Sequence, residues 1–368
     1  MNRAIKYRIY PNDDQRELMM KTFGCCRKVW NLMLADRETA YKHDGSMLKP
    51  TPAMYKDEYP YLREVDSLAL ANVQLDLQDA YKRFFTVKGA GHPKFKSRKH
   101  AKLSYTTNNQ KGTVALGDKV IRLPKIGLVR AKLHRMPKTN WMLKAATISM
   151  SRDGKFYCSV LFEYDKDIVP VPHPENNAIG LDYKSDGLYA SSNGEISGSP
   201  KYYRKGQDRL TKAQRKLRHK DKSGNNYRKA CIKIAKEHRH IANQRRDSLH
   251  KKSAEIANQY DIVCVEELNM RSMANKGFGN GKATLDNGYG MFLDMLEYKM
   301  HDRGKQLIRI DKWFPSSQIC SCCGTIHLEV KDLSVRKWVC PDCGTEHDRD
   351  INAAINILNE GIRLFLEG

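Results

Sequence analysis

The sequence lacks any long apolar run: no stretch among its 368 residues approaches the roughly 18 uninterrupted apolar positions of a membrane-spanning helix. The N-terminal segment MNRAIKYRIYP has no apolar run of signal-peptide length. Internal repeats are absent, and no long tract has a disordered composition. Hydrophobic residues make up 40% of the chain, which is enough for well-packed cores. We therefore expect a protein that is kept in the cytosol and has no membrane partner.

Acidic residues are scarce relative to basic ones: 42 Asp and Glu stand against 65 Lys and Arg, a formal net charge of +23. A surplus of this size repels itself unless a polyanion neutralises it. Nucleic acid is the leading candidate partner, because contacts to phosphates release counterions and so favour binding. A membrane surface is the alternative, but neither end of the chain carries a basic amphipathic helix with a bulky apolar face.

The first 170 residues combine strand and helix patterns. The N-terminal segment alternates like a strand, and apolar residues at helical spacing predict helices over about 15–41 and 67–85. The following segment has short β runs that end at Gly, Pro or Asp, typical of a small antiparallel barrel or sandwich. We predict a β-barrel domain made of residues 1–10 and 103–170, with residues 11–102 inserted as a helical lobe.

After a linker at Pro170–Pro174, strands alternate with helices to the end of the chain. The predicted elements are a hairpin at 177–192, a basic helical region at 204–260 broken at 223–225, a strand at 261–266, a Gly/Asn-rich loop at 271–288, a helix at 291–303, a strand at 306–311 and a helix from about 350. This order indicates a mixed α/β layer domain from residue 175 to 368. The whole chain is thus expected to be a multi-domain α+β protein.

Five of the ten cysteines are scattered, which is typical of small buried side chains in a cytosolic protein. The other five lie close together, and four of them form the pairs Cys320-x-x-Cys323 and Cys340-x-x-Cys343, each followed by glycine. Two such pairs match the paired turns of a tetrahedral zinc site. A redox function would not explain two pairs. Four sulfur ligands leave no position for water, so the zinc is expected to be structural, with Cys322 a free thiol.

Three acids stand at the ends of predicted elements. Asp182 ends the strand NAIGLD, Glu266 ends DIVCVE, and Asp350 opens the terminal helix. Carboxylates at one sheet edge are the hard oxygen ligands that Mg²⁺ prefers, and three of them can hold two ions about 4 Å apart for phosphodiester hydrolysis. Each acid alone would be read as a turn cap, a solvated strand end or a helix N-cap. Their strand, strand, helix order favours catalysis.

The sequence resembles the TnpB family of transposon-encoded, RNA-guided DNA endonucleases, which are related to type V CRISPR effectors. The resemblance runs nearly from end to end. It rests on the motifs GLD (180–182), VEELN (265–269), WFPSSQ with the first cysteine pair (313–324), CPDCG (340–344) and HDRDINAAINI (347–357), and on IKYRIYP (5–11), GHPKFKSRK (91–99) and HRHIANQRRDSLHK (238–251).

The resemblance implies a RuvC-type, ribonuclease H-like nuclease domain with a zinc ribbon inserted at 313–346. It makes Asp182, Glu266 and Asp350 the catalytic triad. Glu267 stands where the family commonly has Asp or Asn, and Glu266 is favoured because it directly continues the strand. The implied partners are a guide RNA transcribed from the transposon end and a double-stranded target DNA cut beside a short flanking motif. The implied setting is a monomer near the bacterial or archaeal nucleoid.

Two segments are candidate nucleic-acid surfaces. Residues 201–252 hold 19 Lys and Arg against four acids, as expected of a phosphate track for an RNA–DNA duplex rather than of a merely solvated helix. A second basic segment, 82–102, is interleaved with aromatic residues. Three residues on one face of the second helix could reach base edges, although polar helix faces are mostly solvated. The candidate contact residues are Gln74, Gln78, Lys82, Lys94, Lys96, Arg98, Arg239, Arg245 and Arg246.

Two other functions remain open from the sequence. A guide-RNA-binding repressor without nuclease activity would have lost one or more of the three acids, and all three are present. A transposase that joins strands would use the same two-metal chemistry, and the carboxylates alone do not exclude it. The resemblance and the two separate basic segments favour the nuclease.

Overall fold

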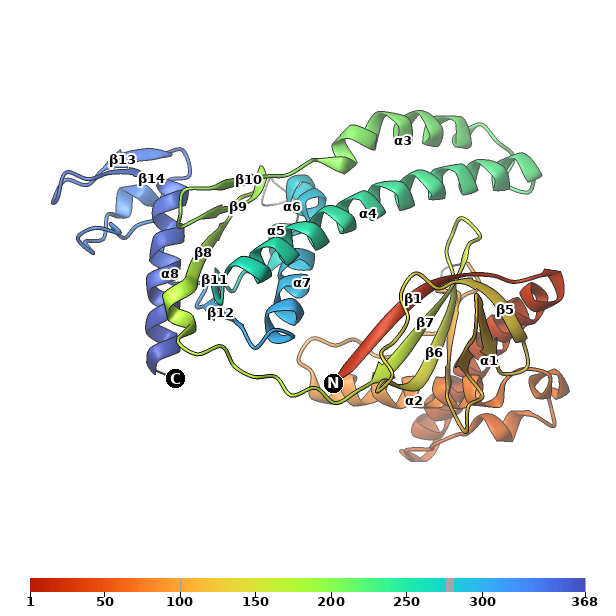
Figure 1. The fold of residues 1–368 in the computed structure, drawn as a ribbon. Helices are drawn as coiled ribbons and strands as arrows, with labels where there is room; N and C mark the ends of the chain where they lie inside the picture. Colours follow the sequence, from red (N-terminus) through yellow and green to blue (C-terminus); the bar gives the residue numbers. More distant parts are fainter. Residues whose placement is uncertain (100, 276–280, 368) are drawn as a thin grey trace. The chain divides into compact units, whose positions relative to one another are not determined.

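The computed structural model describes residues 1–99, 101–275 and 281–367 (Figure 1). The chain divides into two compact units, Met1–Lys166 and Asp167–Gly368. No helix among the described residues has both the length and the apolar character needed to cross a bilayer. Each unit has its own sheet and its own core.

The first unit is built on a seven-stranded antiparallel sheet. Its strands are β1 (Asn2–Tyr10), β2 (Ser104–Asn108), β3 (Ala115–Leu116), β4 (Val120–Leu123), β5 (Gly127–Lys132), β6 (Met142–Met150) and β7 (Phe156–Glu163), in the order β2-β6-β7-β1-β5-β4-β3. The N-terminal strand β1 lies between β7 and β5, with Ile5 opposite Val160 and Ile9 opposite Ala131. The expectation that the N-terminal strand completes this sheet is confirmed.

The sheet is open, whereas the sequence predicted a barrel or sandwich. In the part of the chain that the structure describes, β2 and β3 lie at the two edges, and no ladder joins them. A barrel closes only when its edge strands pair over several residues, and β3 is two residues long. The short edge strand also limits pairing with other chains.

Two long helices complete the first unit. The helix α1 (Asp13–Asp44) begins at a capping box between Asn12 and Gln15 and ends at Gly45, whose φ of 71° is left-handed. The helix α2 (Ser67–Thr86) is capped by Asp66. Their buried residues join those of β1, β5, β6 and β7 in one core. The predicted helices are confirmed to within a few residues, and they share a core with the strands instead of forming a lobe with a core of its own.

The second unit contains a mixed five-stranded sheet with helices on both faces. Its strands are β8 (Ala178–Tyr183), β9 (Gly187–Ser191), β10 (Ile196–Gly198), β11 (Ile262–Glu266) and β12 (Gln306–Ile310), in the order β10-β9-β8-β11-β12. The strands β8, β9 and β10 are antiparallel, while β8, β11 and β12 are parallel. The helices α4 (Asn225–Gln259) and α7 (Tyr289–His301) cover one face, and α8 (Arg349–Glu367) covers the other.

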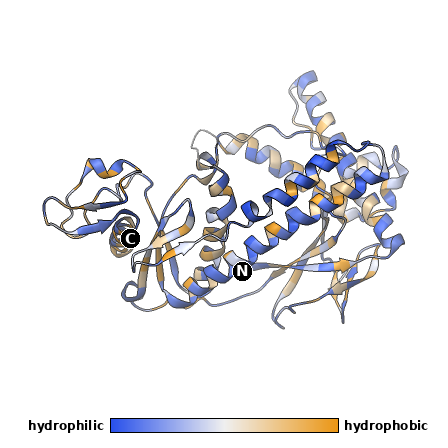
Figure 2. Cartoon of the chain, turned by 90° about the horizontal axis from the view of Figure 1, so that it is seen from above, coloured by the Kyte–Doolittle hydropathy of each residue, from blue (hydrophilic) through white to orange (hydrophobic). Residues whose placement is uncertain are grey.

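The remaining elements project from this sheet or connect its parts. The helix α3 (Tyr202–Arg218) packs against α4 where Gly206 meets Ile241. Hydrophilic residues predominate along these long helices in Figure 2. The predicted Gly/Asn-rich loop instead contains α5 (Met270–Met273) and α6 (Gly281–Asn287), with residues 276–280 outside the described ones. A hairpin of β13 (Lys337–Val339) and β14 (Glu346–Asp348) carries the second cysteine pair at its turn.

Candidate active site and cysteine cluster

Two of the three predicted acids lie at the ends of neighbouring parallel strands. Leu181 of β8 is opposite Val265 of β11, so Asp182 and Glu266 follow at the same level. Side chains alternate between the faces of a strand. Leu181 and Val265 belong to the core beneath α4 and α7, so both acids point to the face that α8 covers. Glu267 lies beyond the strand and is exposed.

Asp350 comes to the same edge because α8 lies unusually close to the sheet. A Cβ at Gly180 would be 2.0 Å from the carbonyl oxygen of Ala354, and one at Gly361 would be 2.2 Å from Sγ of Cys264. Only a residue without Cβ allows this approach. The first turn of α8 contains Asp350, where the helix dipole stabilises a negative charge.

The surroundings of Asp182 and Glu266 oppose their ionisation. Burial, and then the charges of Glu266 and Asp350, hold the pKa of Asp182 well above its usual range. Burial also raises the pKa of Glu266, opposed by a hydrogen bond that the Ser316 hydroxyl donates to Oε1. Among the described residues, the three carboxylates do not all converge within the 4.8 Å that the cysteine sulfurs meet.

Two cations hold Asp350. Nζ of Lys184 donates to Oδ2, and Nη1 of Arg336 lies 3.5 Å from Oδ1. Lys184 follows Asp182 by two residues, and that spacing places both on one face of an extended chain. The sequence reading missed Lys184, Arg336 and Ser316. The two-residue spacing was the available signal for Lys184, and Ser316 lies within a motif already singled out.

The four predicted zinc cysteines form one cluster, with all sulfurs within 4.8 Å of one another. Cys320 and Cys343 have their sulfurs 3.6 Å apart, and Cys323 and Cys340 have theirs 3.7 Å apart. A tetrahedral ion with bonds of about 2.3 Å to sulfur has edges of about 3.8 Å, whereas a disulfide needs about 2.05 Å. The sulfurs therefore have the spacing of metal ligands. Cys322 is exposed and outside the cluster.

The two cysteine turns have the same backbone geometry. Gly324 and Gly344 have left-handed φ values of 80° and 71°. Their amides donate to the carbonyls of Cys320 and Cys340, at 2.9 and 2.8 Å. The repeated geometry explains why a glycine follows each pair: the chain reverses there, and both thiolates point to the same side.

Buried histidines flank the cluster. Nε2 of His347 lies 3.1 Å from the sulfur of Cys320, and Nε2 of His327 lies 3.3 Å from that of Cys340. Trp338 contacts both imidazole rings, with centroids 4.6 and 5.3 Å away. An imidazole N–H directed at a thiolate stabilises its charge. The sequence reading did not single out these histidines, because their spacing to the cysteines is set by the fold of the hairpin.

Side-chain amides of α8 attach the cluster to the five-stranded sheet. Asn352 accepts a hydrogen bond from the amide of Ser321 at 2.9 Å and donates to the carbonyl of Ile319 at 2.7 Å. Asn356, one helical turn later, also donates to Ile319 at 2.7 Å. The helix that begins at Asp350 therefore also positions the segment containing the first cysteine pair.

The predicted nucleic-acid contacts of the first unit divide into exposed and engaged side chains. Lys82, Lys94 and Arg98 are exposed, while Gln74, Gln78 and Lys96 are half-buried. Lys96 places its ammonium 3.4 Å from the ring centroid of Trp30, and burial lowers its pKa. This packing gives Lys96 a structural role.

In the second unit, Arg246 is exposed, whereas Arg239 and Arg245 are half-buried on α4. Arg245 donates from Nη1 to the carbonyl of Leu285 at 2.6 Å. Its aliphatic stem lies beside Gly288, where a Cβ would meet Cδ at 3.2 Å. Arg245 therefore anchors α6 and the start of α7, a role that its place in a basic run did not indicate.

Comparison with known proteins identifies relatives along the whole chain. Family models match over three segments: "Helix-turn-helix domain" over residues 1–46, "Probable transposase" over 159–277 and "Cas12f1-like, TNB domain" over 289–357. A "Putative RNA-guided DNA endonuclease" of Streptomyces pristinaespiralis is 35% identical over 98% of this chain and 90% of its own. The chain belongs to the TnpB family.

A second relative agrees with this membership, and a solved structure shares the fold. "Putative RNA-guided DNA endonuclease InsQ" of Escherichia coli K12 is 30% identical over 97% of this chain and 92% of its own. The solved Cas12f1–sgRNA–target DNA complex is 12% identical, covers 98% of this chain and 99% of that one, and has a TM-score of 0.62. The chain and that solved protein thus share a mixed α/β fold. The segment matched as helix-turn-helix consists here of β1 and the single helix α1.

Proposed function

We propose that this protein is an RNA-guided DNA endonuclease that hydrolyses target DNA beside a short flanking motif. The observation that carries the proposal is the position of Asp182, Glu266 and Asp350 on one face at one sheet edge. Nearly full-length similarity to relatives named as RNA-guided DNA endonucleases supports it. Guide RNA and double-stranded DNA are accordingly the proposed partners.

The donor atoms of the two candidate metal sites differ in kind. The three carboxylates offer hard oxygen ligands, which suit Mg²⁺. The cysteine cluster offers four thiolates, which suit a structural Zn²⁺. When bound, a magnesium pair activates water and stabilises the leaving oxygen. We propose that the second unit is the ribonuclease H-like, RuvC-type domain and that residues 313–346 are its zinc ribbon.

The chain's own groups prepare the carboxylates for this task. The strand pairing fixes Asp182 beside Glu266, and Ser316 fixes the orientation of the Glu266 carboxyl through its hydrogen bond. Lys184 and Arg336 neutralise Asp350, and we propose that they are drawn away when divalent ions bind. Closely spaced carboxylates that repel one another gain a strong preference for cations.

The α3–α4 pair is the proposed track for nucleic acid. The segment that contains it holds most of the net charge, with 19 basic residues against four acidic ones over positions 201–252. Ile241, Leu249 and Ile256 bury one side of α4, so the basic side chains occupy the remaining sides. A surface of this kind holds phosphates without reading sequence, as suits a partner whose sequence is read by base pairing.

The test compares cleavage with RNA binding. Asp182→Ala, Glu266→Gln and Asp350→Ala are expected to abolish cutting of a guide-matched plasmid while binding of the guide RNA is unchanged. Glu267→Gln is the matched control and should cut normally, because Glu267 is exposed beyond the strand. Cutting by Asp182→Ala at the parental rate would show that the site is elsewhere. Joined strands in place of hydrolysed ends would indicate a transposase instead.

A further inference from the structure

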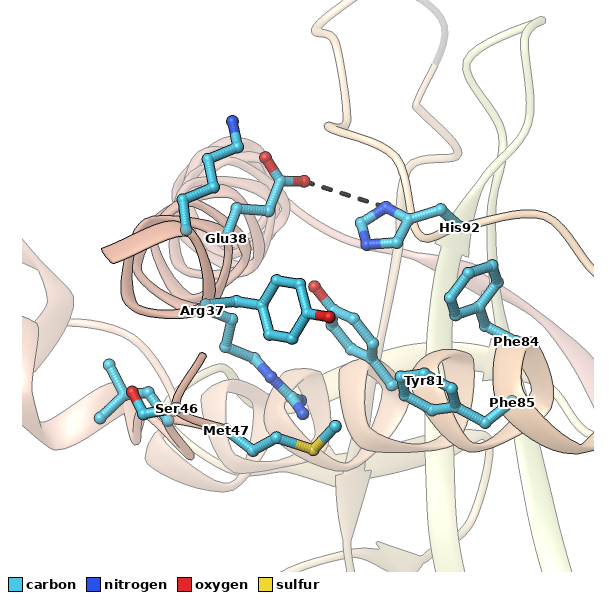
Figure 3. A pocket seen from close by; sticks show the side chains of 11 residues that line it. Arg37, Glu38, Ser46, Met47, Tyr81, Phe84, Phe85 and His92 are labelled. Carbon is cyan, nitrogen blue, oxygen red and sulfur yellow. Dashed lines mark ion pairs between the residues drawn. The ribbon is translucent and has the colours of Figure 1, made fainter. Parts of the chain in front are cut away.

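A cavity of about 440 Å³ opens in the first unit, far along the chain from the three acids. It lies between the C-terminal parts of α1 and α2 and the segment around Met47 (Figure 3). The guide-binding and cleavage roles proposed above do not use it. Its size is within the range of small-molecule binding sites.

Aromatic rings form much of its lining. Tyr81 and Phe85 are stacked, with centroids 6.3 Å apart and planes 23° from parallel. His92 meets Tyr81 and Phe84 edge-on, with centroids at 5.3 and 5.2 Å. Phe85 remains 61% exposed, so its ring does not serve the core. An exposed aromatic cluster at a polar rim is a mark of a binding surface.

Charged side chains of both signs lie around the aromatic rings. The guanidinium of Arg37 lies 4.0 Å from the centroid of the Tyr81 ring. Oε1 of Glu38 lies 3.9 Å from Nδ1 of His92, so a carboxylate also faces the cavity (Figure 3). Lys42 lines the same opening. The site therefore offers flat apolar faces, cations and one hydrogen-bond acceptor that carries negative charge.

A nucleotide with an unpaired base has the matching chemistry. Its base stacks on aromatic rings and on guanidinium planes, and its phosphate pairs with Lys or Arg. The Glu38 carboxylate can accept hydrogen bonds but cannot donate them, so it favours a base edge rich in N–H groups. Guanine offers two such donors side by side, N1–H and N2–H, together with a large stacking face.

We propose that this pocket captures one unpaired guanine of the bound RNA. The inference rests on the proposed function for the source of the RNA, since unpaired loop bases are what proteins stack and read in RNA. Capture of a base here would fix the RNA relative to the first unit, in addition to the electrostatic contacts of the basic segments. Tyr81, Phe85 and Arg37 would hold the base, and Glu38 would select it.

The experiment measures binding of single-stranded RNA hexamers to the full-length protein. The probes are UUGUUU, UUUUUU and the DNA hexamer TTGTTT, competed against one labelled RNA at fixed salt. We expect UUGUUU to bind more tightly than UUUUUU, by up to about 100-fold, because guanine has the larger stacking face and offers the N–H edge that Glu38 accepts. Phe85→Ala should weaken binding of both RNA hexamers, and Glu38→Gln should remove the preference for UUGUUU over UUUUUU.

The matched control is Leu128→Ala, which removes another exposed large apolar side chain of the same unit, 63% exposed and outside both the pocket and the basic segments. It should bind like the parent. Equal binding of the two RNA hexamers by the parent, or equal losses in Phe85→Ala and Leu128→Ala, would overturn the proposal. TTGTTT presents the same guanine face and edge, so its binding should also fall in Glu38→Gln, and no change there would overturn the role of Glu38.

Failure of this inference is distinguishable from failure of the proposed function. Hexamer binding needs no cleavage, so Asp182→Ala should bind UUGUUU as the parent does. If the protein performs guided cleavage but Phe85→Ala does not change hexamer binding, only the proposal for the pocket fails. If the protein binds the guanine hexamer selectively but cuts no guide-matched DNA, only the proposed endonuclease function fails.

Discussion

Asp182 shows how a single residue can be placed against its own electrostatic preference. It lies at the end of a buried strand, next to Glu266 and in the field of Asp350, and all three effects raise its pKa. The compensating cation, Lys184, bonds to Asp350. This loss of stability is expected if the three acids bind cations as proposed, because the charges that attract metal repel one another.

The raised pKa of Asp182 predicts that Asp182→Asn is more stable than the parent when a chelator keeps divalent ions away. The folded protein holds the Asp182 proton more tightly than the unfolded chain does, so this residue costs stability as pH rises from the ordinary carboxyl pKa through the folded one. Asn should therefore raise the melting temperature at pH 7.5, by about 2–4 °C for each kcal/mol regained. At pH 3 the substitution should change little, because both states are then protonated.

Calorimetry at the two pH values checks this expectation. Added Mg²⁺ should raise the melting temperature of the parent and have a much smaller effect on Asp182→Asn, because binding to the folded state alone stabilises it. A lower melting temperature for Asp182→Asn at pH 7.5 would contradict the electrostatic account.

At the scale of elements, α8 connects the candidate active site to the cysteine cluster. It carries Asp350 in its first turn, packs on β8 and β11 through glycine contacts, and bonds to Ile319 through Asn352 and Asn356. Small displacements of this helix would thus alter both sites. A substitution that changes the distance between α8 and the sheet tests this connection.

Gly361→Ala is expected to push α8 away from β11. The new Cβ would meet Sγ of Cys264 at 2.2 Å, and overpacking of this kind costs about 1–3 kcal/mol. Gly290→Ala is the control in another helix of the same unit, where the nearest atom, Cγ of Met270, is 3.5 Å away. Chemical denaturation should show a loss of unfolding free energy for the first variant only. Equal stability of the two would disprove the close packing.

Loss of one proposed zinc ligand is expected to destabilise the protein. If the cysteines hold zinc as proposed, Cys340→Ser should lose the ion and have a lower melting temperature, because the ion's binding energy contributes to folding. Cys322→Ser should retain zinc and stay within about 0.5 kcal/mol of the parent, since Cys322 is exposed and outside the cluster. Native mass spectrometry counts the ion directly. Zinc loss in both variants, or in neither, would contradict the assignment of ligands.

At the scale of the whole molecule, the charge of +23 is unevenly distributed along the chain. Lys229, Lys233 and Lys236 follow one another at helical spacing on α4 and are all exposed. They face no close acidic partner among the described contacts. Phosphates of a nucleic acid are then their natural counter-charges.

Replacing Lys229, Lys233 and Lys236 by Gln should therefore weaken nucleic-acid binding mainly at low salt. Each lost phosphate contact lowers the slope of log K against log salt by about 0.7–0.9, so the triple variant should lose about 2–3. A salt titration of guide-RNA binding measures the slope. Lys331 and Lys337, both exposed in the ribbon segment, provide a control pair whose replacement should leave it unchanged. An unchanged slope in the triple variant would remove α4 from the track.

The sequence alone determined the features that depend on neighbours along the chain. The helices α1 and α2, the strand β11 and the cysteine turns were predicted because capping, periodicity and two-residue ligand spacing are local. Tertiary structure decided whether edge strands pair, and it gave an open sheet because β3 is too short. It also decided that Lys184 pairs with Asp350, that His327 and His347 flank the cysteines, and that Arg37 meets Tyr81. These contacts join distant segments, so no local pattern encodes them.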